Sequence, residues 1–186
     1  MTSSVGRPLD NRGELDTRAL RHALGRFATG VCVVTGLDAN GQRLAITVNS
    51  FNSVSLVPPL VLFSIARTCR GFEGWMSANR YGVNVLAAHQ AELSNRFSGA
   101  LADKWAGLTV ATGRSGVPLL PDAIARFECE LERREDGGDH VIFLARVVAF
   151  DAARDADPLC FFAGRYWTLA DTSVPTPAEP TLFYGW

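Results

Sequence analysis

The stretch that decides the fold is FECELERREDGGDHVIFLARVVAF, residues 127–150. In its first half, apolar residues at 127, 129 and 131 alternate with glutamates at 128, 130 and 132, a period of two that is typical of a β-strand with one solvent-facing side. The sequence Asp136-Gly137-Gly138-Asp139 is typical of a tight turn. The segment HVIFLARVVAF then returns as the partner strand, so the stretch predicts a long β-hairpin.

Apolar and β-branched segments on both sides of this hairpin predict further strands. The segment 31–56 is interrupted by Asp38-Ala39-Asn40-Gly41, which predicts two strands joined by a turn. Residues 60–66 form a continuous apolar run, as in a strand covered on both faces. Another strand is predicted at 81–87, and the segments LCFFA and RYWTL supply short strands near the end of the chain.

Fewer segments have the apolar spacing of helices. Leu20, Ala23, Leu24 and Phe27 share one face of a helix predicted over 17–29, with the N-cap at Asp16 and the end at Gly30. A second helix is predicted over 89–105, and residues 67–79 are expected to form a loop that runs into a short helix. Because helices do not alternate with the six or seven strands, the pattern favours a closed antiparallel β-barrel with appended helices. Core packing is the expected role of the large aromatic residues Trp75, Phe97, Trp105, Tyr166 and Trp167.

Length and charge restrict the possible classes of protein. The chain has 186 residues, with 18 Lys and Arg against 19 Asp and Glu, which predicts a single domain and no nucleic-acid partner. Four cysteines lie far apart, and the first residues are polar, so the expected protein is reduced and cytoplasmic. The longest apolar runs are about half of the roughly 20 residues that a membrane helix requires, so no membrane span is expected.

Common catalytic motifs are missing from the sequence. It contains neither G-x-G-x-x-G nor G-x-x-x-x-G-K-[ST], and no G-x-S-x-G surrounds a serine. The three histidines have no partner at the spacing of metal ligands, so no metal site is expected.

Polar residues crowd the stretch TVNSFNSVS, residues 47–55, within a predicted strand. One interpretation is a flat ligand that hydrogen-bonds along the strand, as a pyrimidine-like ring edge and a phosphate require. The alternative is a segment whose serines and asparagines bond their own backbone.

Two further segments allow a functional and a structural interpretation. The segment 67–72, RTCRGF, follows a predicted buried strand, so its N–H groups and two guanidiniums could hold a phosphate, although surface arginines are common at strand ends. His140 directly follows the Gly-Gly turn, on the same strand face as Arg146. It is either a ligand contact or a polar turn residue.

Taken together, five segments resemble the short-chain flavin reductases, the reductase partners of two-component flavin-dependent monooxygenases. They are RFATGVCVVTG, AITVNSFNSVSLVPPLVLFSIART, RYGVNVLAAHQAELSNRFSG with ADKW, GGDHVIFLARVVAF, and PLCFFAGRYWTL, in this order between residues 19 and 169. The resemblance implies a split β-barrel of six to seven antiparallel strands, of the Greek-key type, in a homodimer with flavin at the subunit interface. The expected organisation is an N-terminal arm (1–14), the barrel domain (15–170) and a Pro-rich tail (171–186).

The resemblance also implies which residues bind the cofactors. Thr47, Asn49 and Ser50 would contact the isoalloxazine edge, the segment 53–55 would lie close to it through backbone atoms, and the segment 67–70 would lie near the phosphate. His140 stands in the G-D-H segment that contacts the nicotinamide. The full flavin set implied is Thr47, Val48, Asn49, Ser50, Ser53, Val54, Ser55, Ala66, Arg67, Thr68, Cys69, Arg70, Phe72 and Phe97, and the nicotinamide set is His140, Arg165 and Tyr166.

The activity that the resemblance implies is hydride transfer from NADH or NADPH to N5 of FMN or FAD, with the reduced flavin diffusing to a partner monooxygenase. Such a transfer requires two rings stacked at roughly 3 to 3.5 Å and no side-chain acid or base. The alternatives are a split-barrel reductase that retains FMN and reduces a corrinoid or a ferric complex, and a non-catalytic flavin-binding protein.

Overall fold

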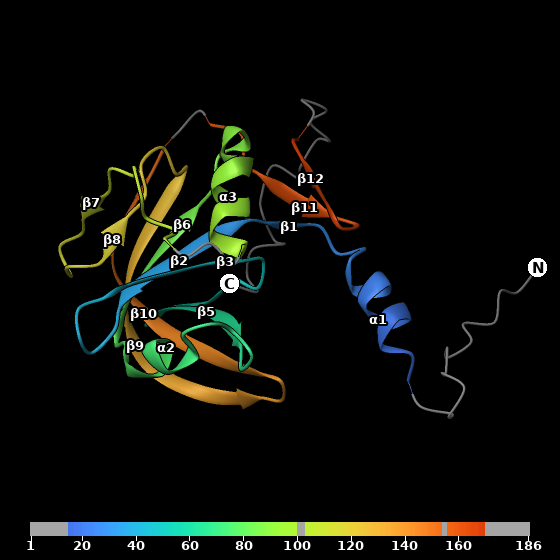
Figure 1. Cartoon of the computed structure of the whole chain (residues 1–186), viewed down its shortest axis with the longest axis horizontal. Helices are drawn as coiled ribbons and strands as arrows, with labels where there is room; N and C mark the ends of the chain where they lie inside the picture. Colours follow the sequence, from blue (N-terminus) through green and yellow to red (C-terminus); the bar gives the residue numbers. More distant parts are fainter. Residues whose placement is uncertain (1–14, 100–102, 154–155, 170–186) are drawn as a thin grey trace, which may run out of the picture.

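The structure is a computed structural model that describes residues 15–99, 103–153 and 156–169. The expected N-terminal arm and Pro-rich tail therefore lie outside the described residues. The main body is a seven-stranded antiparallel sheet in the order β3-β2-β6-β9-β10-β5-β4, which coils into a split barrel (Figure 1). Its strands are β2 (Cys32–Leu37), β3 (Arg43–Val48), β4 (Asn52–Leu56), β5 (Pro59–Ala66), β6 (Arg80–Val85), β9 (Ala125–Gly137) and β10 (His140–Ala152).

The predicted long hairpin is confirmed as β9–β10, the centre of this sheet. Its register runs from His140 opposite Gly137 to Ala152 opposite Ala125, with irregularities after Leu144 and after Val147. Strand β10 also pairs with β5, which places His140 opposite Ala66. The turn of the hairpin therefore lies beside the end of β5.

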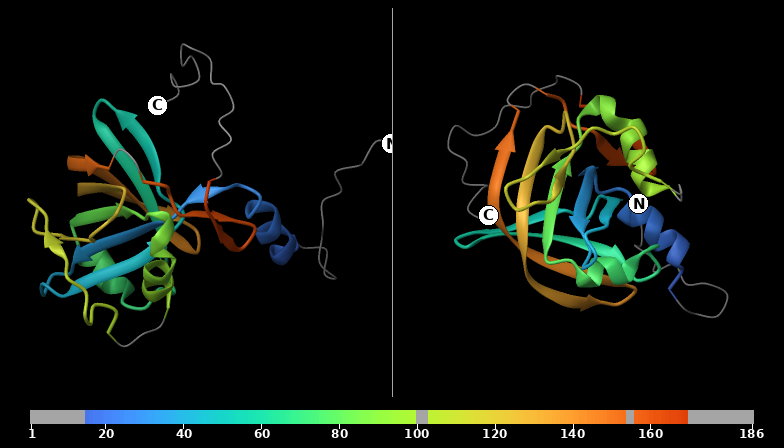
Figure 2. Two further views of the ribbon diagram at one scale, coloured as in Figure 1. Left: turned by 90° about the horizontal axis from the view of Figure 1, so that it is seen from above. Right: turned by 60° about the vertical axis from the view of Figure 1, so that its left-hand side comes forward.

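The predicted second strand of segment 31–56 is divided into β3 and β4 by the link Asn49–Phe51. In a flat sheet, β3 and β4 would be separated by six strand spacings, roughly 29 Å. The link from Val48 to Asn52 reaches at most about 14 Å when fully extended. The sheet must therefore curl until its two edges approach each other, as Figure 2 shows.

The split barrel that the family resemblance implies is confirmed, whereas the closed barrel that the strand pattern favours is not formed by the described strands. Within the described part of the chain, β3 pairs only with β2, and β4 pairs only with β5. The two edge strands are thus linked through the chain and not by a backbone ladder, so the barrel is split between them.

The helices are shorter than predicted. Helix α1 (Thr17–Leu24) starts where expected, because the Asp16 carboxylate accepts hydrogen bonds from the N–H groups of Arg18 and Ala19, but it ends at Gly25. Its apolar face remains exposed, with Phe27 at 77% exposure just beyond its end. The predicted helix over 89–105 consists of a 3-10 turn, η1 (Ala88–Gln90), and helix α3 (Ala91–Ser98), and the expected short helix is α2 (Phe72–Ser77).

Two small sheets complete the fold. The predicted short strands near the end of the chain are β11 (Cys160–Phe162) and β12 (Arg165–Trp167), which join β1 (Thr29–Gly30) in a separate three-stranded sheet. A two-stranded sheet contains β7 (Ala111–Thr112) and β8 (Pro118–Leu119).

The core has two parts, one inside the barrel and one between the sheet and α3. Inside the barrel, the stacked rings of Phe63 and Phe143 meet the edge of Tyr81, with ring centroids 5.2 and 5.7 Å apart. Trp75 and Phe97 are buried as predicted, one in each part. The prediction is wrong for Trp167, which is 51% exposed, because β12 lies outside the barrel and covers only part of α3.

The solvent-facing side predicted for strand β9 is also wrong at Glu128, which is buried. Its carboxylate accepts hydrogen bonds from the N–H groups of Arg114 and Ser115, at 3.0 and 2.7 Å, and from the Ser115 hydroxyl at 2.6 Å. Burial alone would raise the pKa of Glu128, but these hydrogen bonds outweigh it and the pKa is lowered. The carboxylate thus fastens the β7–β8 loop onto β9.

Replacing this carboxylate with an amide should destabilise the fold. In Glu128→Gln, an NH₂ group faces N–H donors, and we expect a loss of about 1–3 kcal/mol at pH 7 in urea unfolding. Because the pKa of Glu128 lies below its ordinary 4.5, the stabilisation is complete above pH 4.5 and is lost as the pH falls below that value. Glu130→Gln, on the same strand but exposed, is the control and should change stability little. Equal losses in both variants, or a loss in Glu128→Gln that persists at acid pH, would contradict this role.

Candidate active site

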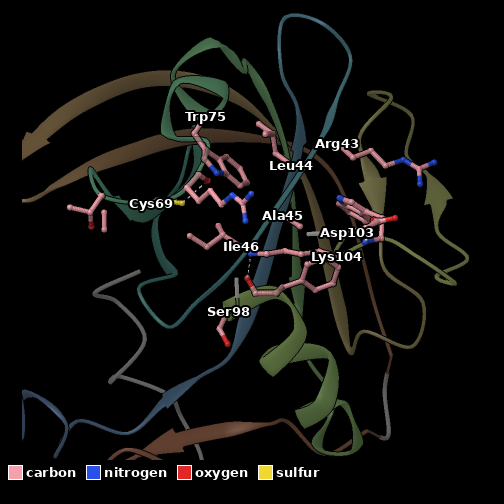
Figure 3. Close-up of a pocket in the computed structure, with 15 residues that line it drawn as sticks. Arg43, Leu44, Ala45, Ile46, Cys69, Trp75, Ser98, Asp103 and Lys104 are labelled. Atoms are coloured by element: carbon pink, nitrogen blue, oxygen red, sulfur yellow. Dashed lines mark hydrogen bonds between the residues drawn. The ribbon is translucent and has the colours of Figure 1, made fainter. Parts of the chain in front are cut away.

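A pocket of about 520 Å³ lies along the first residues of β3, within the size range of small-molecule sites (Figure 3). Five segments of the chain form its walls: β3 itself, the loop between β5 and α2, helix α2, the end of α3, and the loop that starts at Asp103. The lining residues are Arg43, Leu44, Ala45, Ile46, Ala66, Thr68, Cys69, Arg70, Trp75, Phe97, Ser98, Gly99, Asp103, Lys104 and Trp105.

Five residues of the predicted flavin set line this pocket: Ala66, Thr68, Cys69, Arg70 and Phe97. Sequence reasoning missed its other end, formed by Arg43, Lys104 and Trp105. The sequence placed Lys104 and Trp105 on a helix that actually ends at Ser98, and nothing in the sequence brings β3 next to them. The only signal was the ADKW segment within the family resemblance.

The pocket is rich in positive charge. Arg43, Arg70 and Lys104 line it, and in the part of the chain that the structure describes none of them forms an ion pair. The one lining acid, Asp103, accepts hydrogen bonds from the N–H groups of Trp105 and Ala106. Cations without a carboxylate partner favour an anionic ligand such as a phosphate.

Lys104 lies at the centre of this charge. Its Nζ donates to the carbonyl of Phe97 at 2.8 Å, which leaves further N–H groups for a ligand. Burial lowers the pKa of Lys104, the nearby Cys69 raises it, and the charge of Arg70 lowers it again. Burial raises the pKa of the Cys69 thiol, and Lys104 opposes this effect.

Aromatic rings form part of the pocket wall. Phe97 and Trp105 meet edge to face with centroids 5.2 Å apart, and Trp75 is buried behind the β3 side. Flat rings next to uncompensated cations suit a ligand that combines an aromatic ring system with phosphate. The residues present therefore fit a flavin nucleotide.

The polar stretch 47–50 lies at the other end of β3, where its hydroxyls already have partners. The Thr47 hydroxyl donates to the carbonyl of Ser94 at 2.7 Å, and the Ser50 hydroxyl accepts from the Ser64 N–H at 3.0 Å and contacts its carbonyl at 3.3 Å. Val48 is buried in the core, whereas Asn49 is exposed. Asn49 is thus the side chain of this stretch best placed to reach a ligand.

The remaining polar residues of the stretch lie on β4 and do not line the β3 pocket. Ser53 and Ser55 line a second groove of about 820 Å³ between β4 and β10. Val54 lies at a register shift of β4 and is exposed. Phe72, another residue of the predicted flavin set, packs against the core inside the barrel.

Arg67 does not line the pocket with Arg70, because it binds the β9–β10 turn instead. Its Nε donates to the carbonyl of Gly138 at 2.9 Å, its guanidinium lies 3.1 Å from the Asp136 carboxylate, and its N–H donates to the carbonyl of Asp139 at 2.9 Å. A hydrogen bond from the Gly138 N–H and the contacts with Arg67 lower the pKa of Asp136. Arg67 thus fixes the turn that carries His140.

His140 lies at the start of β10 with its ring 42% exposed. Its Nδ1 is 2.7 Å from the Asp139 carboxylate, and this hydrogen bond lowers the pKa of Asp139. The contact orients the ring and leaves Nε2 without a partner among the described residues.

The other two residues predicted for the nicotinamide lie on β12. Arg165 is exposed, whereas the Tyr166 hydroxyl is 2.8 Å from the Ser94 hydroxyl and donates to the Asn95 side chain at 3.0 Å. Tyr166 thereby attaches the small sheet to α3, and Ser94 connects it onward to Thr47 on β3.

Comparison with known proteins identifies the class. Residues 24–170 match the flavin reductase like domain family, and the chain belongs to this family. A protein of Rhizobium meliloti named probable flavin reductase is 42% identical over 91% of this chain, which spans 55% of that protein's length.

Two further comparisons concern partners and cofactors. The reductase subunit of a flavin-dependent monooxygenase from Rhodococcus jostii is 37% identical, over 90% of this chain and 86% of that protein. A structure of an NADH:FAD oxidoreductase from Streptomyces globisporus, in complex with NAD and FAD fragments, is 31% identical with a TM-score of 0.81, over 91% of this chain and 100% of that one. Other relatives are named as NADH-dependent FMN reductases.

The described residues contain no group of three or more His, Cys, Asp or Glu side chains that could hold a metal ion. None of the helices described is long and apolar enough to cross a membrane.

The different positions of Arg67 and Arg70 lead to opposite expectations for their variants. Arg67→Ala should loosen the turn at 136–140, seen as faster amide hydrogen exchange there, and leave flavin affinity unchanged. Arg70→Ala should lower flavin affinity about 10-fold, because it removes a pocket cation that is available to a phosphate, and leave exchange at 136–140 unchanged. Equal losses of flavin affinity in both variants would show that Arg67 also serves the phosphate.

Proposed function

We propose that the protein is an NADH-dependent flavin reductase that transfers hydride to N5 of FMN or FAD. The observation that carries the proposal is the β3 pocket, whose unpaired cations and aromatic walls fit a flavin nucleotide in a chain of the flavin reductase family. The flavin, when bound, supplies the electron-accepting ring. The protein's own residues have to bind the flavin and the NADH and to orient their rings.

Different residues bind the flavin phosphate, the flavin ring and the nicotinamide. Arg70 and Lys104 bind the phosphate, and Asn49 with the backbone of the 47–50 stretch orients the ring edge. His140, oriented by Asp139 and held by the Arg67-bound turn, contacts the nicotinamide. Arg165 and Tyr166 on β12 border the same cofactor. Because hydride passes directly between stacked rings, no side chain has to act as acid or base.

The reduced flavin then leaves and diffuses to a separate monooxygenase. The relative from Rhodococcus jostii, named as the reductase subunit of such an enzyme, supports this proposal. A product that must leave requires moderate flavin affinity, and a pocket open to solvent along β3 is consistent with it.

A reducing compartment is part of the same proposal. None of the four cysteines forms a disulfide, and burial raises the pKa of both Cys32 and Cys129 to about 12. Such thiols are unreactive core residues. We infer that the protein acts in the cytoplasm.

The proposed homodimer is supported by an apolar surface on β4 and β10. Large side chains are exposed there, including Val57 at 92%, Leu56 at 70% and Phe150 at 74%. Leu56 and Phe150 line the same groove of about 820 Å³ as Ser53 and Ser55. Exposed apolar patches of this kind are unfavourable in a monomer, and a second copy of the chain would cover them.

The function is tested by NADH oxidation at 340 nm with and without added flavin. The rate should rise and saturate with free FMN or FAD. His140→Ala should raise the KM for NADH about 10-fold and change flavin affinity less than about 2-fold, and the exposed His89→Ala serves as control. Activity without added flavin would indicate a retained prosthetic group and another acceptor. Flavin binding without NADH oxidation would indicate a non-catalytic binding protein.

The dimer is tested by adding charge to the exposed patch. Phe150→Asp should convert a dimer into a monomer in analytical ultracentrifugation, because it buries an unpaired carboxylate in the interface. Ala39→Asp adds the same charge at the exposed β2–β3 turn and should leave the dimer intact. A monomeric wild-type protein, or a Phe150→Asp variant that stays dimeric, would contradict the proposed interface.

A further inference from the structure

One end of the β3 pocket is formed by the cation Arg43 and the aromatic ring of Trp105. A single phosphate bound at the 67–70 loop would not reach this end. The guanidinium of Arg43 lies over the Trp105 ring, 5.6 Å from its centroid, and the ring meets Phe97 at its edge. Arg43 and Cys69 lie on opposite sides of the pocket (Figure 3). Arg43 is therefore remote from the loop at 67–70 that was predicted to bind phosphate.

The Trp105 ring is held in place by the loop that carries it. The Asp103 carboxylate accepts from the N–H groups of Trp105 and Ala106, at 2.9 and 3.1 Å. Lys104 donates to the Phe97 carbonyl, and the Arg96 guanidinium donates to the carbonyl of Ala106, so the loop is attached to α3 at two points. The Arg43 guanidinium lies over one face of this fixed ring, and an aromatic ring and a guanidinium plane are both surfaces on which a nucleobase can stack.

The length of β3 separates this end from the ring-binding end. Strand residues rise about 3.3 Å each, so Arg43 lies roughly 20 Å along the strand from Asn49. A flavin with its ring edge at Asn49 and its phosphate at Arg70 and Lys104 leaves the Arg43 and Trp105 end unoccupied. A ligand that continues beyond this phosphate can fill it.

We propose that Arg43 and Trp105 form a subsite for an adenosine phosphate, and that this subsite makes FAD the preferred flavin over FMN. The adenine stacks on the surface that the Trp105 ring and the Arg43 guanidinium form together, and the N–H groups at the edge of the Arg43 guanidinium bind the second phosphate. The inference rests on the proposed flavin reductase function and specifies its substrate.

The same chemistry is present in the adenosine half of NADH, but the structure favours FAD. Lys104 and Trp105 are consecutive residues, so the stacking surface directly adjoins the cations assigned to the flavin phosphate. His140, the residue assigned to the nicotinamide, lies on the β9–β10 turn and does not line this pocket.

The test compares the dissociation constants of FAD and FMN for the full chain by equilibrium dialysis. The wild-type protein should bind FAD more tightly. Arg43→Gln and Trp105→Leu should each weaken FAD binding about 10-fold and FMN binding less than about 2-fold. Arg133→Gln removes an exposed charge from β9 and should change neither constant. Because Trp105 packs on Phe97, the exposed Arg43 variant keeps the test valid if Trp105→Leu does not fold.

Three results would overturn the inference, and they are distinguishable from failure of the function. If the variants weaken FMN binding and FAD binding equally, Arg43 and Trp105 serve the phosphate that both flavins share, or the stability of the fold. An unchanged ratio of the two flavins with a raised KM for NADH would assign the subsite to the pyridine dinucleotide. If the wild-type protein binds FAD and FMN equally well and oxidises NADH with FMN, the flavin reductase function holds and the adenosine subsite is wrong. If neither flavin binds, the function and the inference fail together.

Discussion

The three-residue link between β3 and β4 is the constraint on which the rest of the structure depends. Neighbours in the chain occupy opposite edges of the seven-stranded sheet, so the sheet has to curl into a barrel. The link cannot form a backbone ladder, and the Ser50 hydroxyl instead bonds the backbone of Ser64 on β5. Ser50 is therefore required first by the fold.

The short link between β3 and β4 also determines where the candidate site lies. Because no described strand pairs with the outer edge of β3, this edge remains available beside the loop after β5 and the end of α3. Cations from β3, from the β5–α2 loop and from the loop after α3 meet there, and none of them has a carboxylate partner among the described residues. The long β9–β10 hairpin supports the proposed nicotinamide contact, since Arg67 at the end of β5 fixes the turn that presents His140.

Local patterns predicted the elements well, and contacts distant in sequence explain the errors. The alternation around residue 129, the Gly-Gly turn and the Asp16 cap identify their elements because each is decided by its immediate neighbours. Glu128 follows the same alternation but is buried, because a loop more than ten residues away covers it. The sequence around Arg67 and Arg70 likewise does not show that Arg67 binds the carbonyl of Gly138, whereas Arg70 lines the pocket, because the turn at 136–139 is distant in sequence. The family resemblance named part of the pocket, whereas Arg43 and Trp105 required the structure.

Flavin binding along β3 is tested most directly by amide hydrogen exchange of the full chain with and without saturating flavin. The predicted result is slower exchange in residues 43–50, 66–71, 97–99 and 103–105, with little change in residues 147–151 of β10. Protection confined to residues 147–151 and the facing part of β4, with none along residues 43–46 or 66–71, would contradict it and place the flavin in the apolar groove.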